Sequence, residues 1–187
     1  MKQNILPAIK LTIVCIVFFM GIYPLFIWAV AHAAPAHGKG ETIEANGKVA
    51  GYKLIGQKFT DDKYFNGRPS AVDYNAASSG GSNKGPTNPD YLKTVQDRID
   101  TFLAHNPGIK KEEIPSELVT ASGSGQDPDL SPEAAKVQVK RLAAIRKIDE
   151  TKLFALVDSH TDKPFLGLFG ASKVNVLQLN IALDEIK

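Results

Sequence analysis

The feature that most constrains this chain is an apolar run near its N-terminus. Residues 11–31 read LTIVCIVFFMGIYPLFIWAVA and include no charged side chain. A helix needs about 20 such residues to cross a bilayer. The alternative is a secretory signal peptide, because AVAHAAPA (29–36) has small residues at cleavage-like spacing. A signal peptide should have an apolar core of only about 7–15 residues, however, so the length favours an uncleaved anchor. Pro24 is tolerated in a membrane helix and marks where it can kink.

Charged residues beside the span predict its orientation. Lys2 and Lys10 precede it, and positive residues stay on the cytoplasmic side, while Lys39 beyond it is a weaker opposing signal. We therefore expect a cytoplasmic N-terminus at 1–10, a transmembrane helix at 11–31, a linker at 32–40 and an extracytoplasmic domain at 41–187. This places the chain in a cytoplasmic membrane as a single-pass protein in contact with the lipid bilayer.

The part of the chain beyond the span is electrically balanced. All 20 acidic residues lie after residue 38, and so do all 22 basic residues except Lys2 and Lys10. A nucleic-acid-binding protein would need a basic face, so we expect no nucleic-acid partner. The single cysteine, Cys15, lies in the span and cannot form a disulfide within the domain.

Local signals in the first half of the domain predict a hairpin, a long loop and a helix. Alternation on both sides of Asn46 and Gly47 indicates a hairpin over residues 41–54. Residues 61–87 are polar and too long for an ordinary connection, which suggests a functional loop. Asn88 as cap and Pro89 in the first turn then start a helix that ends after His105.

The second half of the domain is predicted to be mainly helical. Ser131 as cap and Pro132 start a helix that continues to about Lys147, and a short helix follows at 150–159. The last segment, 173–187, reads either as a helix capped by Asn175 or as a strand. The fold class is therefore α+β, a single N-terminal transmembrane helix followed by one mixed extracytoplasmic domain.

The loop SGGSNKGPTNP (79–89) has glycines at the spacing of a phosphate-binding loop, at Gly80 and Gly85. Such a loop needs a lysine with a backbone donor after its last glycine, and here that position is Pro86. No apolar strand leads into Gly80 either. The loop therefore calls for a different explanation from phosphate binding.

Six motifs resemble one known family. They are LIGQKF (54–59), YFNGRPSA (64–71), SGGSNKGPTNP (79–89), ELVTASGSG (117–125), DPDLSPEAAKVQVKR (127–141) and VNVLQLNIALD (174–184). Together and in this order they resemble the KdpC family, the small subunits of the bacterial Kdp potassium-transporting P-type ATPase. The resemblance covers nearly the whole chain, membrane helix included.

The resemblance implies an accessory, non-catalytic subunit of a high-affinity ATP-driven potassium uptake complex in the inner membrane. Its partners would be a potassium-channel-like subunit and a P-type ATPase subunit. The chain itself has neither the phosphorylation motif DKTGT nor a potassium-filter sequence such as TVGYG. We therefore expect no enzymatic activity of its own.

The family is also described as a catalytic chaperone that raises the ATP affinity of the ATPase subunit through a transient ternary complex. By that resemblance Gln138 is the residue expected to contact nucleotide, with no cofactor bound stably. The predicted topology argues the other way, because a domain outside the cytoplasm meets no ATP. A surface amide without a ligand is the alternative for Gln138.

The glycine-rich loop and its surroundings are the predicted partner interface. Glycines there would let the backbone of another subunit approach closely, and a nearby arginine could bind a carboxylate or carbonyl of the partner. The expected interface residues are Arg68, Gly80, Gly81, Ser82, Asn83 and Gly85. The alternatives are a simple turn before a helix cap and a solvated arginine.

An exported, membrane-anchored hydrolase is the competing class of function. Ser122 or Ser124, Asp127 and His160 supply the residue types of a catalytic triad in the chain order of α/β-hydrolases. No GxSxG elbow surrounds either serine. The 4 histidines also lack metal-ligand spacing, so no metal site is predicted.

Overall fold

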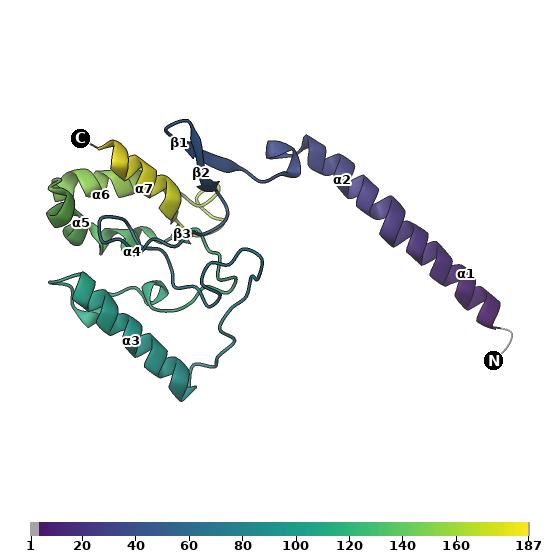
Figure 1. The fold of residues 1–187 in the computed structure, drawn as a ribbon, viewed down its shortest axis with the longest axis horizontal. Coiled ribbons are helices and arrows are strands. Elements are labelled where there is room, and N and C mark those ends of the chain that lie inside the picture. Colours follow the sequence, from purple (N-terminus) through teal and green to yellow (C-terminus); the bar gives the residue numbers. More distant parts are fainter. Residues whose placement is uncertain (1–3, 187) are drawn as a thin grey trace. The chain divides into compact units, whose positions relative to one another are not determined.

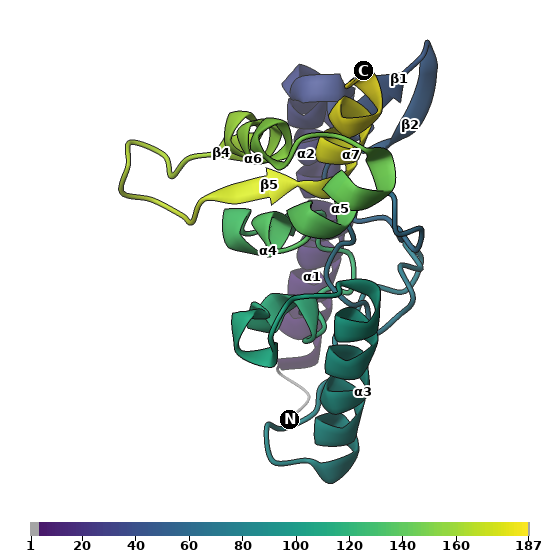
Figure 2. The same cartoon turned by 90° about the vertical axis from the view of Figure 1, so that its left-hand side faces the viewer.

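A computed structural model describes residues 4–186. The chain divides into two compact units between Glu41 and Thr42. Figures 1 and 2 label their helices and strands.

The N-terminal unit is one helix of 29 residues, Ile5–Ala33, long and apolar enough to cross a membrane. It consists of α1 (Ile5–Ile16), a π-helical segment η2 (Val17–Ile22) and α2 (Tyr23–Ala33), followed by a 3-10 turn η3 (Pro35–Gly38). None of its described residues is buried. Pro24 has no N–H to donate, and just before it the N–H of Tyr23 donates to the carbonyl of Phe18, five residues back. The wider π turn is how the helix accommodates the proline.

The domain opens with the hairpin that the sequence predicts. Strands β1 (Thr42–Ala45) and β2 (Lys48–Tyr52) pair antiparallel, with a register shift between Ile43 and Glu44 that leaves Ala50 of β2 without a partner in β1. Asn46 and Gly47 have φ of 52° and 72°, as a two-residue hairpin turn of type I′ requires.

A long irregular segment then leads to α3 (Pro89–His105). The side chain of Asn88 accepts a hydrogen bond from the N–H of Tyr91 at 3.0 Å, which confirms the predicted cap. Two 3-10 turns, η4 (Lys111–Glu113) and η5 (Ser116–Leu118), follow. Figures 1 and 2 both show α3 on the side of the domain away from α6 and α7.

A small antiparallel sheet joins distant parts of the chain. Its strands are β3 (Asp129–Leu130), β4 (Thr161–Asp162) and β5 (Lys173–Asn175), in the order β3-β5-β4. Val174 at the centre pairs with Leu130 on one side and Thr161 on the other. The last segment, predicted as either a helix or a strand, contains both: strand β5 passes directly into helix α7 (Val176–Glu185), whose cap is Asn175.

The predicted helix from Pro132 to Lys147 is wrong as one continuous element. It is divided into α4 (Pro132–Lys136) and α5 (Val139–Arg146), with Gln138 between them. The Ser131 side chain caps α4 by accepting from the N–H of Ala134 at 3.1 Å, as predicted. Helix α6 (Glu150–Ser159) lies where the short helix was expected.

The core lies where the three-stranded sheet meets α4, α5, α6 and α7. Its largest fully buried apolar side chains are Phe65, Leu130, Leu142, Leu153, Leu179, Leu183, Val139, Val157 and Val174. Phe65 comes from the long irregular segment, so that segment is tied to the core. The α+β class with one N-terminal helix that can span a membrane is confirmed.

Candidate functional site

The two glycine-rich loops, predicted separately, pack against each other. The N–H of Gly80 donates to the carbonyl of Ser124 at 2.8 Å, and the Ser79 hydroxyl donates to the same oxygen at 2.9 Å. A Cβ on Gly81 would lie 3.0 Å from the carbonyl oxygen of Gly123. The close backbone approach that Gly81 allows is thus made by the protein's own second loop.

A third segment, residues 68–74, completes this arrangement, which we call the paired loops (68–74, 79–82 and 122–127). The Ser70 hydroxyl donates to the carbonyl of Gly125 at 2.8 Å and accepts from the N–H of Tyr74 at 2.9 Å. Gly125 has a φ of 68°, and a Cβ there would lie 2.8 Å from the carbonyl oxygen of Gly80. Only glycine fits this position without strain.

Arg68 is held inside the paired loops. Its Nη1 lies 2.9 Å from Oδ2 of Asp127, and both side chains are partly buried. The Tyr74 hydroxyl donates to the backbone carbonyl of Arg68. Burial raises the pKa of Tyr74 to about 12, with Asp127 adding to the shift and Arg68 opposing it. The ion pair shows that Arg68 shapes the loops from within, whereas its role in binding a partner stays a prediction.

The remaining predicted interface residues are the outward part of the first loop. Asn83 and Gly85 are exposed and Ser82 is partly buried. No atom lies within 4 Å of where a Cβ on Gly85 would be. The structure therefore brings Arg68, Gly80 and Gly81 together in the paired loops and leaves Asn83 and Gly85 facing outward.

Gln138 is fully buried, so the expectation of a surface amide is wrong. Its Oε1 accepts from the N–H of Asn66 at 2.8 Å and from Nη2 of Arg141 at 2.7 Å. Its Nε2 donates to the carbonyls of Asn66 and Ala134, each at 3.0 Å. The side chain thus bonds to both backbone groups of Asn66, as the backbone of a neighbouring strand would, and joins the irregular segment to α4 and α5.

Arg141 extends the same network. Its guanidinium is almost fully buried, and it donates to the Asn106 side chain at 2.9 Å, to the Asn66 side chain at 3.0 Å and to the backbone carbonyls of Asp62 and Tyr64. Burial lowers the pKa of Arg141, and the nearby Asp62 and Asp61 oppose that shift. With Gln138 it fixes residues 62–66 on the helices. Arg141 was not singled out from the sequence, and its position three residues after Gln138, on the same side of a helical turn, is the one local signal that could have linked the two.

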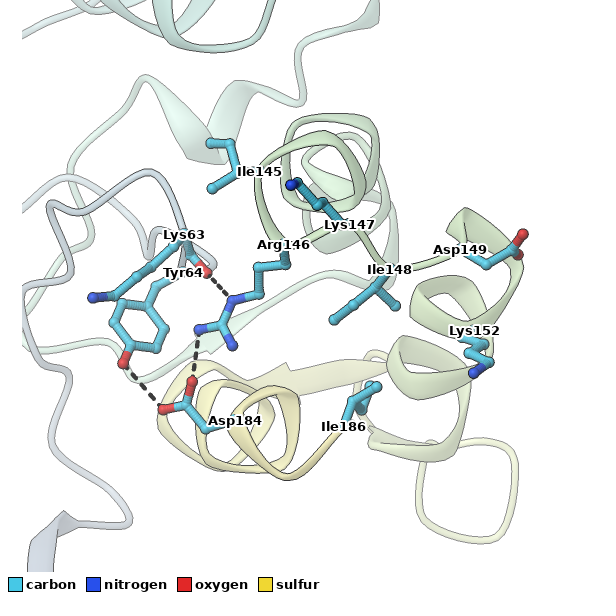
Figure 3. A pocket seen from close by; sticks show the side chains of 10 residues that line it. All are labelled: Lys63, Tyr64, Ile145, Arg146, Lys147, Ile148, Asp149, Lys152, Asp184 and Ile186. Atoms are coloured by element: carbon cyan, nitrogen blue, oxygen red, sulfur yellow. Dashed lines mark hydrogen bonds and ion pairs between the residues drawn. The ribbon is translucent and has the colours of Figure 1, made fainter.

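An open pocket of about 550 Å³ lies beside this network, between residues 63–64, the end of α5 and the last residues of the domain. Figure 3 shows Arg146 at its centre, where Nη2 lies 2.6 Å from Oδ1 of Asp184 and Nε donates to the Lys63 carbonyl at 2.7 Å. The Tyr64 hydroxyl donates to Asp184 at 3.0 Å, and the Arg146 guanidinium lies 5.0 Å from the centre of the Tyr64 ring. These contacts tie α7 to α5, so the charges at the centre serve packing.

The residues of the hydrolase alternative are not assembled into a triad. Nδ1 of His160 lies 2.9 Å from the Leu156 carbonyl and 3.1 Å from the Ser159 hydroxyl, and Asp127 is paired with Arg68. The structure gives no contact between His160 and Ser122 or Ser124 within residues 4–186. Over the same residues, no three histidine, cysteine or acidic side chains gather where they could hold a metal ion.

Comparison with known proteins decides the family. The family described as KdpC: K+-transporting ATPase, c chain, matches residues 5–185. The chain belongs to the KdpC family. Three curated KdpC subunits of potassium-transporting ATPases illustrate the range. The subunit of Flavobacterium psychrophilum is 60% identical over 99% of this chain and 100% of its own length. The subunit of Caldanaerobacter subterraneus is 47% identical over 100% of this chain and 98% of its own length. The subunit of Bacillus cereus is 44% identical over 99% of this chain and 97% of its own length.

Membership of the KdpC family confirms the resemblance found in the six motifs. The chain is a KdpC subunit of the Kdp potassium-transporting ATPase. With one helix able to span a membrane, it is a membrane-anchored, single-pass subunit. The match extends over the helix and the domain together, so both belong to what the family has in common.

Proposed function

We propose that this chain is a non-catalytic subunit that stabilises assembly of a high-affinity, ATP-driven potassium uptake complex. Its N-terminus would lie in the cytoplasm and its α+β domain outside the inner membrane, as Lys2 and Lys10 before the span predict. The observation that carries the proposal is the family match over residues 5–185, which includes both the anchor and the domain.

The partners in this proposal are a potassium-channel-like subunit and a P-type ATPase subunit. The chain has no DKTGT sequence that could be phosphorylated, so ATP hydrolysis falls to another subunit. The paired loops support a binding role, because their internal hydrogen bonds fix the backbone before any partner arrives. Such preorganisation lowers the entropic cost of association.

The second part of the proposal is the catalytic-chaperone role, in which the subunit raises the ATP affinity of the ATPase subunit. A nucleotide contact through Gln138 would require at least one of its four hydrogen bonds to break. Assembly therefore has the stronger support of the two. The chaperone role predicts that the ATP hydrolysis that remains without this chain has a raised KM for ATP. An unchanged KM would exclude it.

Affinity purification tests the assembly role. The tagged full-length chain is purified in mild detergent from cells that also express the other subunits, and copurifying proteins are identified by mass spectrometry. We expect a potassium-transporting subunit and a P-type ATPase subunit to copurify with the tagged chain. A parallel preparation of the chain with Phe19→Arg, which places a charge in the middle of the span, is the control for assembly through the membrane. Recovery of the unmodified chain alone would contradict the proposal.

A further inference from the structure

The connection between β4 and β5 has an apolar tip at its turn, residues 164–169 (PFLGLF). Phe165, Leu166, Leu168 and Phe169 are 71%, 74%, 80% and 65% exposed. Figure 2 shows this connection extending away from the rest of the domain. Outside the membrane helix, no other five consecutive described residues hold as many exposed large apolar side chains. Single exposed apolar residues are ordinary, but a cluster of this kind marks an interaction site.

The backbone of the apolar tip is closed on itself. Phe165 and Phe169 exchange hydrogen bonds, with N···O distances of 2.9 and 3.0 Å. The N–H of Leu168 donates to the Phe165 carbonyl at 3.1 Å, and that of Gly167 to the Pro164 carbonyl at 2.9 Å. These bonds matter because a buried backbone donor without a partner is costly. These bonds pair four of the five backbone N–H groups of residues 164–169, so they reduce that cost when the apolar tip enters a dry environment.

The turn at the apolar tip carries an apolar side chain where the backbone disfavours one. Leu166 and Gly167 both have positive φ, 54° and 73°. Turns of this kind prefer asparagine, aspartate or glycine at both positions, and another residue there costs about 1–2 kcal/mol. The hydrogen bonds across the turn give the apolar tip a fixed shape, and Leu166 adds one more exposed apolar group. A fixed shape suits a protein surface, whereas a fluid lipid interface does not require one.

The charges at the base of the apolar tip also favour a protein over the bilayer. Lys173 is paired with Asp129 at 2.7 Å, and Lys163 is preceded by Asp162. The base is therefore close to neutral, whereas loops that bind anionic lipid carry excess basic residues. Residues 163–173 also contain no tryptophan or tyrosine, the aromatic residues enriched at membrane interfaces.

We propose that the apolar tip docks into an apolar groove on another subunit of the same potassium-transporting complex. The inference rests on the proposed function and adds to it the surface and the chemistry of the contact. Phe165, Leu166, Leu168 and Phe169 form the centre of the interface, and the neutral base forms its rim. Truncation of a central residue that acts as a hot spot weakens association at least tenfold.

The test compares Leu168→Ser with Leu92→Ser in the full-length tagged chain. Leu92 is a matched control, since it is also an exposed leucine (52%) but lies on α3. Both variants should have the parent's urea midpoint, because neither side chain is buried. We expect Leu168→Ser to reduce recovery of the large subunits about tenfold and Leu92→Ser to leave it unchanged. Equal recovery with Leu168→Ser would overturn the inference.

Photo-cross-linking provides a second, independent measurement. A photoreactive phenylalanine analogue is placed at position 168 or, as the control, at position 92, in the assembled complex. A cross-link from 168 to another subunit supports the inference, and cross-links to lipid alone would overturn it in favour of the bilayer. If the parent chain recovers no other subunit, the proposed function itself fails. If it recovers them and position 168 cross-links to none, only the docking inference fails.

Discussion

Three glutamines in the domain should respond to the same substitution in different ways. In Gln138→Met the side chain keeps its length but loses all four hydrogen bonds. The N–H and carbonyl of Asn66, the carbonyl of Ala134 and one N–H of Arg141 then lose this partner in a buried or partly buried environment. At about 1–3 kcal/mol for each group, less some relaxation, we expect a loss of about 3–6 kcal/mol in the free energy of unfolding. This is a large share of the 5–15 kcal/mol typical of domains.

Gln126 is the opposite case. It is also buried, but neither its Oε1 nor its Nε2 has a hydrogen-bond partner among the described residues. Gln126→Met removes this unpaired amide at nearly constant volume and should stabilise the domain by about 1–2 kcal/mol. Gln96 is exposed on α3, and there the same change should stay within about 0.5 kcal/mol.

Urea unfolding of the full-length chain in mild detergent, followed by circular dichroism, measures all three effects. Tryptophan fluorescence would not report on the domain, because the single tryptophan, Trp28, lies in α2. We expect the midpoints in the order Gln126→Met, parent and Gln96→Met together, then Gln138→Met, with no change on addition of ATP. A parent-like midpoint for Gln138→Met would refute its structural role and return it to the candidates for nucleotide contact.

Three further predictions follow from the paired loops and the anchor. Gly125→Ala should cost about 2–4 kcal/mol, because its φ is 68° and the Cβ would collide with Gly80, whereas Gly85→Ala should cost almost nothing; urea midpoints of the two variants test this. Because the pKa of Tyr74 is raised to about 12, its neutral form contributes about 2–3 kcal/mol to the free energy of unfolding, fully present below pH 10 and lost as the pH rises through about 12. The free energy of unfolding of Tyr74→Phe, measured by urea unfolding, should therefore fall less over that pH range than that of the parent. Phe19→Arg should reduce membrane insertion, measured as carbonate-resistant protein, and N-terminal sequencing that finds a mature start near Ala34 would contradict the anchor.

Local signals predicted the elements of this fold well, because each depends on neighbouring residues. Asn88 and Ser131 cap their helices through hydrogen bonds to residues three positions later. Asn46 and Gly47 form the hairpin turn for a similarly local reason. Strands β3 and β4, in contrast, were not predicted, because they have two residues each and show too little alternation to be recognised.

Contacts between distant residues could not be predicted in the same way. The sequence indicated two glycine-rich loops but not that Ser79 bonds to Ser124, 45 positions away. Gln138 was expected on the surface because nothing near it in the chain shows that Asn66 lacks a backbone partner. The apolar tip was not singled out at all, since PFLGLF reads as an ordinary apolar segment until its exposure is known. The predicted domain boundaries and interface residues stay predictions.

Potassium-stimulated ATP hydrolysis tests the central claim most directly. Membranes are prepared from a host without its own Kdp genes that expresses the other subunits, either with or without this chain. We predict that stimulation by potassium requires the chain, that Leu92→Ser supports it fully and that Leu168→Ser supports it poorly. Equal potassium-stimulated hydrolysis with and without the chain would contradict the claim that it is an accessory subunit needed for the working complex.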